Sequence, residues 1–305
     1  CDVGIVLNVS ADHLGLGGIN TLEQLAEVKS VIAAVVKREG HAVLNADDPL
    51  VLAMRERSPG DVVLVSTSPD ENPAVEEHLA QSGIAVLVER DTFVIRRGRL
   101  RIPIAGVREV PLMMGGAARF QRGNILSAIA AAYVQGIRYD DIRAGLLSFF
   151  PSPALTPGRL NLMRVARGRI LVDYGHNAMA VGGLMELVLG IDAARRLGVI
   201  TAPGDRRDDD IRELGRLAAE LDHVIIKEDS DRRGRDPGEI AGLVREGLVA
   251  GGLSDDEIEV VADELEAVDR GMALLNDRDL LVVLVDDVPG VLGHLRGRSQ
   301  PAAVS

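Results

Sequence analysis

The chain has 305 residues, enough for two domains, because compact units usually hold roughly 100–200 residues each. Hydrophobic residues make up 47% and charged residues 26%, which is typical of a globular protein, and the scarcity of aromatic residues predicts an aliphatic core. With 34 basic and 46 acidic residues the net charge is -12, which argues against a broad surface for nucleic acid or for anionic membranes.

The sequence shows neither a membrane span nor a secretion signal. It has no run of about 18 apolar residues and no charged leader followed by a short apolar segment. The only cysteine, Cys1, cannot form an internal disulfide, which agrees with a reducing compartment. We therefore expect a cytoplasmic protein. The chain also lacks an initial Met, and its first residues already have the composition of a buried strand.

The front half has the pattern of an α/β domain. Apolar runs at 3–9, 42–44 and 62–65 alternate with amphipathic stretches, which predicts a parallel sheet covered by helices. Segments 92–97 and 99–104 flank Gly98 like a small hairpin. Segments 124–136 and 140–149 are predicted helices, and the second places Ile142, Leu146 and Phe149 at helical spacing.

A proline-rich segment divides the chain. Residues 151–158 hold three prolines and a glycine, a composition that breaks helices and suits an interdomain linker, so we predict domains at 1–155 and 156–305. Beyond the linker, strands alternate regularly with helices. This predicts a Rossmann-like α/β domain with ligands at the carboxyl ends of its strands, which lie near 169–172, 197–201, 224–227, 259–261 and 280–285.

Two candidate sites follow the first predicted strand. Asp12 and His13 stand where an open parallel sheet places its ligands, although an isolated Asp-His pair is more often a simple Asx turn. Lys29 falls between Leu25 and Ile32 on the apolar face of the next helix. A buried ammonium there needs a partner, a modification or a metal, and the alternative is a lysine that extends from the edge of the face.

Further polar residues follow later strands. Asn45-Ala46-Asp47-Asp48 is a turn at a strand end, and Asp173 and His176 emerge from a buried strand just before Asn177, which suits a helix cap. The loop 204–207 is placed to meet an anion, although exposed arginines are common. The acidic segments 208–210 and 228–229 are expected to be solvated.

Several motifs are absent. The chain has no G-x-x-x-x-G-K-[ST] phosphate loop and no G-x-G-x-x-G dinucleotide fingerprint, which argues against a nicotinamide dehydrogenase. It also lacks H-E-x-x-H, G-x-S-x-G and paired C-x-x-C patterns, so zinc peptidases, α/β-hydrolases and zinc fingers receive no support.

The order of the modest motifs resembles the Mur ligase superfamily, which joins amino acids to carboxylates with ATP. Segments 8–14, 45–48, 157–159 and 173–177 resemble the family patterns N-[IV]-x-x-D-H-[LM], N-x-D-D, P-G-R and D-Y-A-H-[NT]-P, while Lys29 and Asn124 resemble its helix lysine and its N-A-L-A-A asparagine. Segments 13–19, 28–31, 202–207 and 227–234 look most like the cyanophycin synthetases. Gly175 and Ala178 depart from the family's alanine and proline.

The resemblance implies a fold and a set of roles. The fold is the rear portion of a Mur ligase central ATPase-type domain followed by a Rossmann-like C-terminal domain. His13 would bind magnesium, although imidazole is an uncommon magnesium ligand. Lys29, as the amine or as a carbamate, would help to place a second metal. The other implied roles are adenine binding by Asn124, phosphate contact by Arg159, ribose binding by Asp173, and domain closure over ATP at His176 and Asn177.

The resemblance also implies an activity, with ATP and Mg²⁺ as cofactors. A carboxylate on a poly-aspartate (cyanophycin) backbone would become an acyl phosphate and then accept L-arginine, with magnesium and arginine neutralising charge. The family's phosphate loop and ATP-grasp half are missing from the chain, so we expect it to be inactive alone and to form part of a homo-oligomer when complete. The alternatives are a peptidoglycan-precursor or folate-type ligase, a dipeptide-polymerising relative, and a non-catalytic module that binds polymer or nucleotide.

Overall fold

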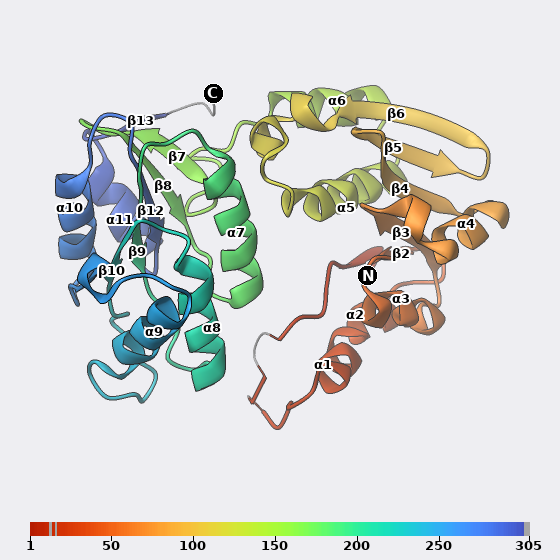
Figure 1. Ribbon diagram of the computed structural model, residues 1–305. Coiled ribbons are helices and arrows are strands. Elements are labelled where there is room, and N and C mark those ends of the chain that lie inside the picture. The colour runs from red at the N-terminus through yellow and green to blue at the C-terminus, as the bar shows by residue number, and fades with distance from the viewer. Residues whose placement is uncertain (12–13, 16, 302–305) are drawn as a thin grey trace. The chain divides into compact units, whose positions relative to one another are not determined.

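The computed structural model describes residues 1–301 except 12, 13 and 16. The chain forms two compact units, Cys1–Phe149 and Phe150–Ser305 (Figure 1). The sequence prediction placed the domain boundary after residue 155, whereas this division assigns the whole proline-rich segment to unit 2. No helix within the described ranges is long and apolar enough to cross a membrane.

Unit 1 is built on one six-stranded sheet in the order β1-β2-β3-β4-β5-β6. The first four strands are parallel, and β5 and β6 add the predicted hairpin in antiparallel register. The predicted strands are confirmed, while β4 was not predicted from the sequence. The strands span Val3–Val6 (β1), His41–Asn45 (β2), Asp61–Ser66 (β3), Ile84–Glu89 (β4), Thr92–Arg97 (β5) and Leu100–Gly106 (β6).

Helices cover both faces of this sheet because its parallel strands are apolar on both sides. One core contains Val43, Val65 and Ile125, and the other contains Leu44, Leu64 and Leu25. The α-helices are α1 (Leu22–Lys29), α2 (Val31–Ala34), α3 (Pro49–Leu52), α4 (Pro73–Ala80), α5 (Gln121–Val134) and α6 (Tyr139–Ser148). Short 3₁₀ helices occur at Ala53–Arg57, Pro69–Glu71, Val107–Glu109 and Pro111–Gly116.

Two details of the predicted helical faces are wrong. The helix around Lys29 ends there, and α2 follows after Ser30. Ile32 is 40% exposed, and Ala33 occupies the buried face instead. Phe149, predicted on the buried face of its helix, follows the last residue of α6 and is also 40% exposed. In both cases the helix ends before its apolar pattern does.

Unit 2 is built on a seven-stranded sheet in the order β11-β10-β9-β12-β8-β7-β13. Five strands, from β11 to β8 in this order, are parallel, and β7 and β13 are antiparallel additions at one edge. The five predicted strands are confirmed. The strands span Asn161–Arg164 (β7), Arg169–Asp173 (β8), Arg196–Ile200 (β9), His223–Ile226 (β10), Ile258–Val260 (β11), Leu280–Leu284 (β12) and Gln300–Pro301 (β13).

The helices of unit 2 divide between the two faces of the sheet. Helices α7, α8 and α9 pack together on one face, whereas α10 and α11 share a core with the other (Figure 1). They span Ala178–Gly190 (α7), Asp208–Ala218 (α8), Glu239–Ala250 (α9), Glu264–Leu274 (α10) and Val288–Leu295 (α11), with a 3₁₀ turn at Asp255–Glu257. Adjacent strands β8 and β12 therefore lead into helices on opposite faces. The carboxyl ends of such a strand pair are where open α/β sheets usually bind their ligands, and we call this place the β8–β12 crevice.

Candidate functional site

The turn after β8 lies at this crevice and is fixed by the linker. The carboxylate of Asp173 accepts a hydrogen bond from the backbone N–H of Leu160 at 2.9 Å. The N–H of Tyr174 donates to the carbonyl of Gly158 at 2.8 Å, and the N–H of Val285, just after β12, donates to the carbonyl of Asp173 at 2.9 Å. Segment 158–160 and the ends of two strands therefore form one hydrogen-bonded unit.

Glycine is required at position 158 for the linker to take this path. Gly158 has a φ of +67°, and a Cβ there would lie 2.6 Å from a methyl group of Val288. The turn presents the exposed side chain of Arg159, whose guanidinium donates to the carbonyl of Tyr174 at 3.3 Å. The same guanidinium lies 5.0 Å from the centre of the Tyr174 ring, within cation–π range.

His176 and Asn177 follow on the same turn. The Nδ1 atom of His176 lies 3.1 Å from the carbonyl oxygen of Tyr174, and the two rings are 5.2 Å apart. The Asn177 side chain accepts a hydrogen bond from the N–H of Ala180 at 2.8 Å, which confirms that it caps α7. The structure thus brings Arg159, Asp173, His176 and Asn177 together. The Tyr174 ring contacts both the Arg159 guanidinium and the His176 ring, beside the Asp173 carboxylate.

Burial dominates the electrostatics of Asp173. It raises the pKa of the carboxyl above its ordinary value, against the opposing effects of the Leu160 N–H, the Arg159 charge and the Gly175 N–H. Because burial disfavours the charged form of Asp173, any further hydrogen-bond donor or positive charge that a ligand brings would stabilise its carboxylate. That property suits the predicted contact with a ribose hydroxyl group.

A buried lysine stabilises the neighbouring strand ends and was not recognised from the sequence. Lys227 is 0% exposed, and its ammonium contacts Asp229 at 3.0 Å and Glu264 at 2.8 Å. Thr201 donates to the same Asp229 oxygen at 3.0 Å. The prediction that segment 228–229 is solvated is wrong for Asp229, which is 7% exposed. The sequence signal that could have identified this buried ion pair is a lysine at the end of an apolar strand, two residues before an aspartate.

This lysine network reaches the end of β12 and borders a pocket of about 420 Å³. The two carboxylate oxygens of Glu264 accept from the N–H groups of Asp286, at 2.8 Å, and Asp287, at 3.0 Å. Burial and the nearby negative charges of Asp229 and Glu264 raise the pKa of Asp286. The pocket is lined mainly by acidic residues, which are Glu228, Asp229, Asp263, Glu264, Asp286 and Asp287, together with Ser230, Arg232, Ala262 and Leu265.

The arginine-rich loop after β9 is ordered by its own charges. Arg206 is only 7% exposed, and its guanidinium pairs with Asp205 at 3.1 Å. Arg235 donates to the carbonyls of Gly204 at 2.8 Å and Arg206 at 2.7 Å. Arg206 is therefore part of the protein interior, whereas the exposed-arginine interpretation fits Arg207, which pairs with its helix neighbour Asp210 at 2.8 Å.

The candidates in unit 1 are placed less completely. His13 and Asp12 lie outside the described residues. Lys29 is half-buried, and its ammonium donates to the carbonyl of Asn8, beyond the end of β1, at 3.1 Å. Asn124 is exposed in the first turn of α5 and donates to the side chain of Gln121 at 2.8 Å.

The segment 45–48 acts as a structural turn. Asp48 caps α3 and accepts from the N–H of Val9 at 2.7 Å, whereas Asp47 accepts from the Ser66 hydroxyl and from Thr67. The Asn45 side chain donates to the carbonyl of Leu7 at 2.9 Å. All three polar side chains connect neighbouring strand ends, so the interpretation as a turn accounts for them.

The residues present fit a nucleotide better than a metal. Arg159 offers an exposed guanidinium for phosphate, and the adjacent Asp173 carboxylate can accept from a sugar hydroxyl. Within the described part of the chain, which excludes His13, no group of three His, Cys, Asp or Glu side chains is arranged to hold a metal ion.

Two families of known domains match the chain in succession. Residues 1–132 match the Mur ligase middle domain, and residues 158–284 match the Mur ligase, glutamate ligase domain. Together they match most of both units of the structure, and the chain belongs to the Mur ligase superfamily. Its two mixed α/β sheets are those of the middle and C-terminal domains.

Within the superfamily, the chain is similar to the cyanophycin synthetases. It is 43% identical to the cyanophycin synthetase of Crocosphaera subtropica and 42% identical to that of Synechocystis sp., in each case over 98% of this chain. A UDP-N-acetylmuramoyl-L-alanyl-D-glutamate--2,6-diaminopimelate ligase of Geobacter metallireducens is 27% identical over 97% of the chain and 56% of the relative. The chain spans about a third of the two cyanophycin synthetases, 34% of each.

Solved structures share the fold at lower identity. Mycobacterium tuberculosis folylpolyglutamate synthase, complexed with ADP, aligns with a TM-score of 0.70 at 20% identity, over 99% of this chain and 64% of that one. A Yersinia pestis bifunctional folylpolyglutamate synthase/dihydrofolate synthase, complexed with AMPPNP and a manganese ion, aligns with a TM-score of 0.65 at 17% identity, over 97% and 62%.

Proposed function

We propose that the chain supplies the middle and C-terminal Mur ligase portions of a cytoplasmic cyanophycin synthetase-type enzyme, which adds L-arginine to the side-chain carboxylates of a poly-aspartate backbone. The observation that carries the proposal is the 43% identity to a cyanophycin synthetase over 98% of the chain, against 27% for a peptidoglycan-precursor ligase. The cluster of Arg159, Asp173 and His176 at the β8–β12 crevice supports a nucleotide-dependent reaction.

In the proposed reaction a side-chain carboxylate oxygen of the poly-aspartate attacks the γ-phosphorus of ATP, and ADP leaves. The amine of arginine then attacks the acyl carbon, phosphate leaves, and the nitrogen loses a proton to form the amide. Arg159, held by Tyr174, would neutralise phosphate charge, and Asp173 would orient the ribose. In this proposal His176 and Asn177 border the nucleotide, and Asn124 contacts adenine. Mg²⁺ would enter with ATP, and Lys29 and His13 are the residues of this chain that would help to hold it.

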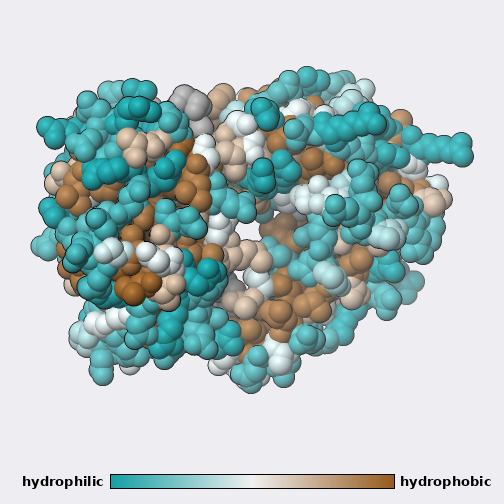
Figure 2. Space-filling view, viewed as in Figure 1, coloured by the Kyte–Doolittle hydropathy of each residue, from teal (hydrophilic) through white to brown (hydrophobic). Residues whose placement is uncertain are grey.

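The surface of unit 1 supports a role for a further protein portion that carries the phosphate loop. Strand β1 pairs with β2 alone among the described strands, so its other edge has no strand partner there. Beside it, α1 and α2 present an apolar stripe of Val28, Val31, Ile32 and Val35, each between 40% and 56% exposed (Figure 2). A strand and helix from the phosphate-loop portion would cover both features.

The test compares the 305-residue chain alone with the same chain supplied together with the phosphate-loop and ATP-grasp portions of a cyanophycin synthetase. We expect the chain alone to incorporate no labelled arginine into poly-aspartate, and the combination to do so with release of phosphate. Incorporation of arginine by the chain alone would contradict the need for a partner portion. Absence of incorporation by a folded combination would contradict the arginine assignment.

Single substitutions test the crevice in the active combination. Arg159→Ala should reduce kcat for arginine incorporation by about 10²-fold or more, because it removes a charge that neutralises phosphate in the transition state. The matched control is Arg167→Ala, which removes an exposed arginine from a turn at the opposite end of β8. Equal activity of the two variants would exclude Arg159 from the reaction.

Two alternative functions give different outcomes in the same assay. A peptidoglycan-precursor or folate-type ligase would use its own amino acid in place of arginine, so the rates for arginine, glutamate and diaminopimelate separate these classes. A non-catalytic module would bind ATP or polymer tightly, yet it would release no phosphate when the missing portions are supplied.

A further inference from the structure

The acidic pocket of about 420 Å³ in unit 2 contains one carboxylate that the fold does not use. The half-buried Asp286 lines this pocket, and its side chain makes neither a hydrogen bond nor an ion pair with any residue that the structure describes. The other five acidic side chains of the pocket accept hydrogen bonds from backbone N–H groups or pair with Lys227. They are Glu228, Asp229, Asp263, Glu264 and Asp287. Capping and ion pairing therefore explain five of the carboxylates and leave Asp286 available to a ligand.

Asp286 lies at the same edge of the sheet as the turn that follows Asp173. Strands β12 and β8 are paired with Leu284 opposite Asp173, and the N–H of Val285 donates to the carbonyl of Asp173 at 2.9 Å. Paired strands lie about 4.8 Å apart. Asp286 follows this hydrogen bond directly, so Asp286 and the turn 174–176 leave adjacent strands side by side, at the β8–β12 crevice.

Electrostatic contacts also place Asp286 near the phosphate-binding candidate Arg159. The guanidinium of Arg233 lies within electrostatic range of both Asp286 and Tyr174. The Tyr174 ring in turn lies 5.0 Å from the guanidinium of Arg159. Arg233 is held in place by an ion pair with Asp205. The free carboxylate of Asp286 and the exposed guanidinium of Arg159 therefore belong to one crevice.

Amide formation in this crevice needs a proton acceptor. The amino group of a free amino acid is an ammonium group at neutral pH, and it cannot attack carbon until it loses a proton. Burial raises the pKa of Asp286, and the negative charges of Asp229 and Glu264 add to this effect, while Lys227 and Arg233 oppose it. A carboxylate whose pKa is raised toward the working pH is a more effective general base.

We propose that Asp286 is the general base that takes a proton from the amino group of the incoming amino acid. This role rests on the proposed function, because it requires an amine and an acyl phosphate in the crevice. The Asp286 carboxylate removes one proton from the ammonium group, and the nitrogen lone pair then forms the C–N bond while the C–O bond to phosphate breaks. The departing phosphate keeps that electron pair and accepts the second proton from nitrogen, which gives the amide. Asp286 then returns its proton to water.

The test compares the wild type with Asp286→Asn in the 305-residue chain combined with the phosphate-loop and ATP-grasp portions. The substitution keeps the size of the side chain and removes the base, so kcat for arginine incorporation should fall about 10²-fold. Hydroxylamine is a neutral nucleophile at neutral pH and converts an acyl phosphate into a hydroxamate, so its reaction needs no base and should keep the wild-type rate. A residue that only supports the fold would slow both reactions.

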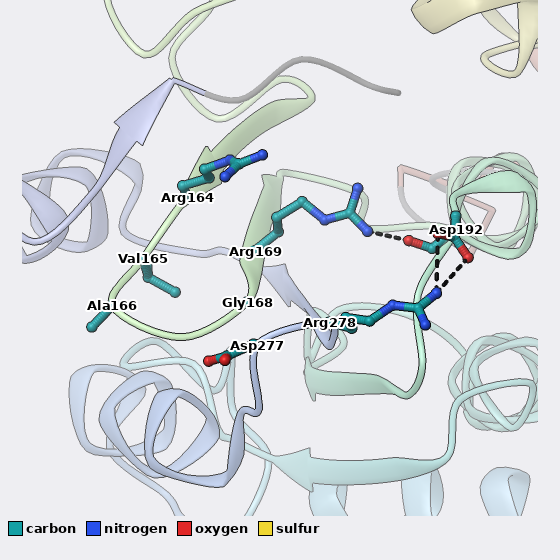
Figure 3. A pocket seen from close by; sticks show the side chains of 8 residues that line it. All are labelled: Arg164, Val165, Ala166, Gly168, Arg169, Asp192, Asp277 and Arg278. Atoms are coloured by element: carbon teal, nitrogen blue, oxygen red, sulfur yellow. Dashed lines mark hydrogen bonds and ion pairs between the residues drawn. The ribbon is translucent and has the colours of Figure 1, made fainter.

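Asp277→Asn is the matched control. Asp277 is an exposed aspartate in the turn before β12, at the opposite end of this strand from Asp286. Figure 3 shows its side chain in a second pocket, of about 610 Å³, without a hydrogen bond or ion pair to the other labelled residues. Its replacement removes the same charge and should leave both rates unchanged.

The pH dependence gives a second readout. The deficit of Asp286→Asn with arginine should shrink as pH rises from about 7 to 9, because a growing fraction of the amine is then neutral without help from a base. The hydroxylamine reaction should show no such recovery, since its nucleophile is neutral throughout this range.

Three results would overturn the assignment of Asp286 alone. They are equal arginine rates in the wild type and Asp286→Asn, equal slowing of the arginine and hydroxylamine reactions, and a deficit that does not shrink as pH rises. A wild-type combination that forms hydroxamate but no arginine product would instead contradict the proposed function. The comparison of Asp286→Asn with the wild type would then use the amino acid that the combination accepts.

Discussion

The carboxyl ends of the two parallel sheets are stabilised in different ways. In unit 1 the polar side chains that follow the strands hydrogen-bond to neighbouring loops, as Asp48 does with Val9 and with the first turn of α3. In unit 2 the corresponding ends surround a buried charge, because Lys227 is enclosed by Asp229 and Glu264. The polar turns of unit 1 can lose single hydrogen bonds separately, whereas the ion network of unit 2 depends on all of its members.

This difference has a functional consequence. A network of buried charges fixes the ends of β9, β10 and β12 relative to each other, because Thr201, Lys227 and Glu264 come from or follow different strands. The crevice beside β8 and β12 therefore has a rigid wall. The strand ends of unit 1 have no equivalent within the described residues, where Lys29 contacts only a backbone carbonyl.

The largest effect is expected from Lys227→Met. Removing the ammonium leaves the carboxylates of Asp229 and Glu264 buried without a counter-charge, and loss of one member of a buried ion pair typically costs about 3–5 kcal/mol. Urea denaturation monitored in unit 2 measures this change. The control, Lys37→Met, removes a lysine from an exposed pair with Asp2 and should change stability little. Similar losses in the two variants would contradict the distinction between the units.

A smaller loss is expected from Gly158→Ala. The added methyl group meets Val288 and forces a φ of +67° on a residue with a side chain, which costs about 1–3 kcal/mol. Because Arg159 is the next residue, the same variant should weaken the proposed contact with ATP. The matched control is Gly293→Ala in α11, where nothing lies near the added methyl group and helix propensity should give a slight gain in stability.

In unit 1, Asp48→Ala should cost about 1–2 kcal/mol, since it removes a helix cap together with the hydrogen bond to Val9. Thermal unfolding monitored in unit 1 provides the measurement. Asp48→Asn keeps an oxygen acceptor for the cap, so its loss should be smaller. A loss as large as that of Lys227→Met would show that the turns of unit 1 are also a single cooperative network.

The smallest effect concerns pH. Burial raises the folded-state pKa of Asp173, so the folded protein holds this proton more tightly than the unfolded chain. The wild type should lose stability relative to Asp173→Asn as pH rises from the ordinary carboxyl pKa through the raised one, and the difference should then stay constant. Urea denaturation of both proteins between about pH 4 and 8 tests this sign. A wild type that gains on the variant over that range would contradict it.

Much of the fold could be predicted because both sheets are built from short apolar runs at regular spacing. The five parallel strands of unit 2 and the hairpin of unit 1 follow from that pattern alone. Edge strands β7 and β13 were missed because Asn161–Arg164 mixes polar and apolar residues, and β13 has only two residues. Pairing partners, rather than composition, define such strands.

The site was predictable in part for the same reason. Arg159, Asp173, His176 and Asn177 could be grouped because they follow a strong strand or the linker motif that resembles P-G-R. The ion network around Lys227 could not be assembled, because Glu264 begins a helix 37 residues later and only the fold brings it to the lysine.

The apolar stripe on α1 and α2 has a practical consequence for work with the protein. With a net charge of -12, the chain should repel its own copies at neutral pH, yet four adjacent valine and isoleucine side chains offer a local surface for self-association. Its solubility should therefore depend more on this stripe than on its charge. Light scattering that rises with salt, and that falls when Val31 and Val35 are replaced by lysine, would identify α1 and α2 as the region to modify before crystallisation.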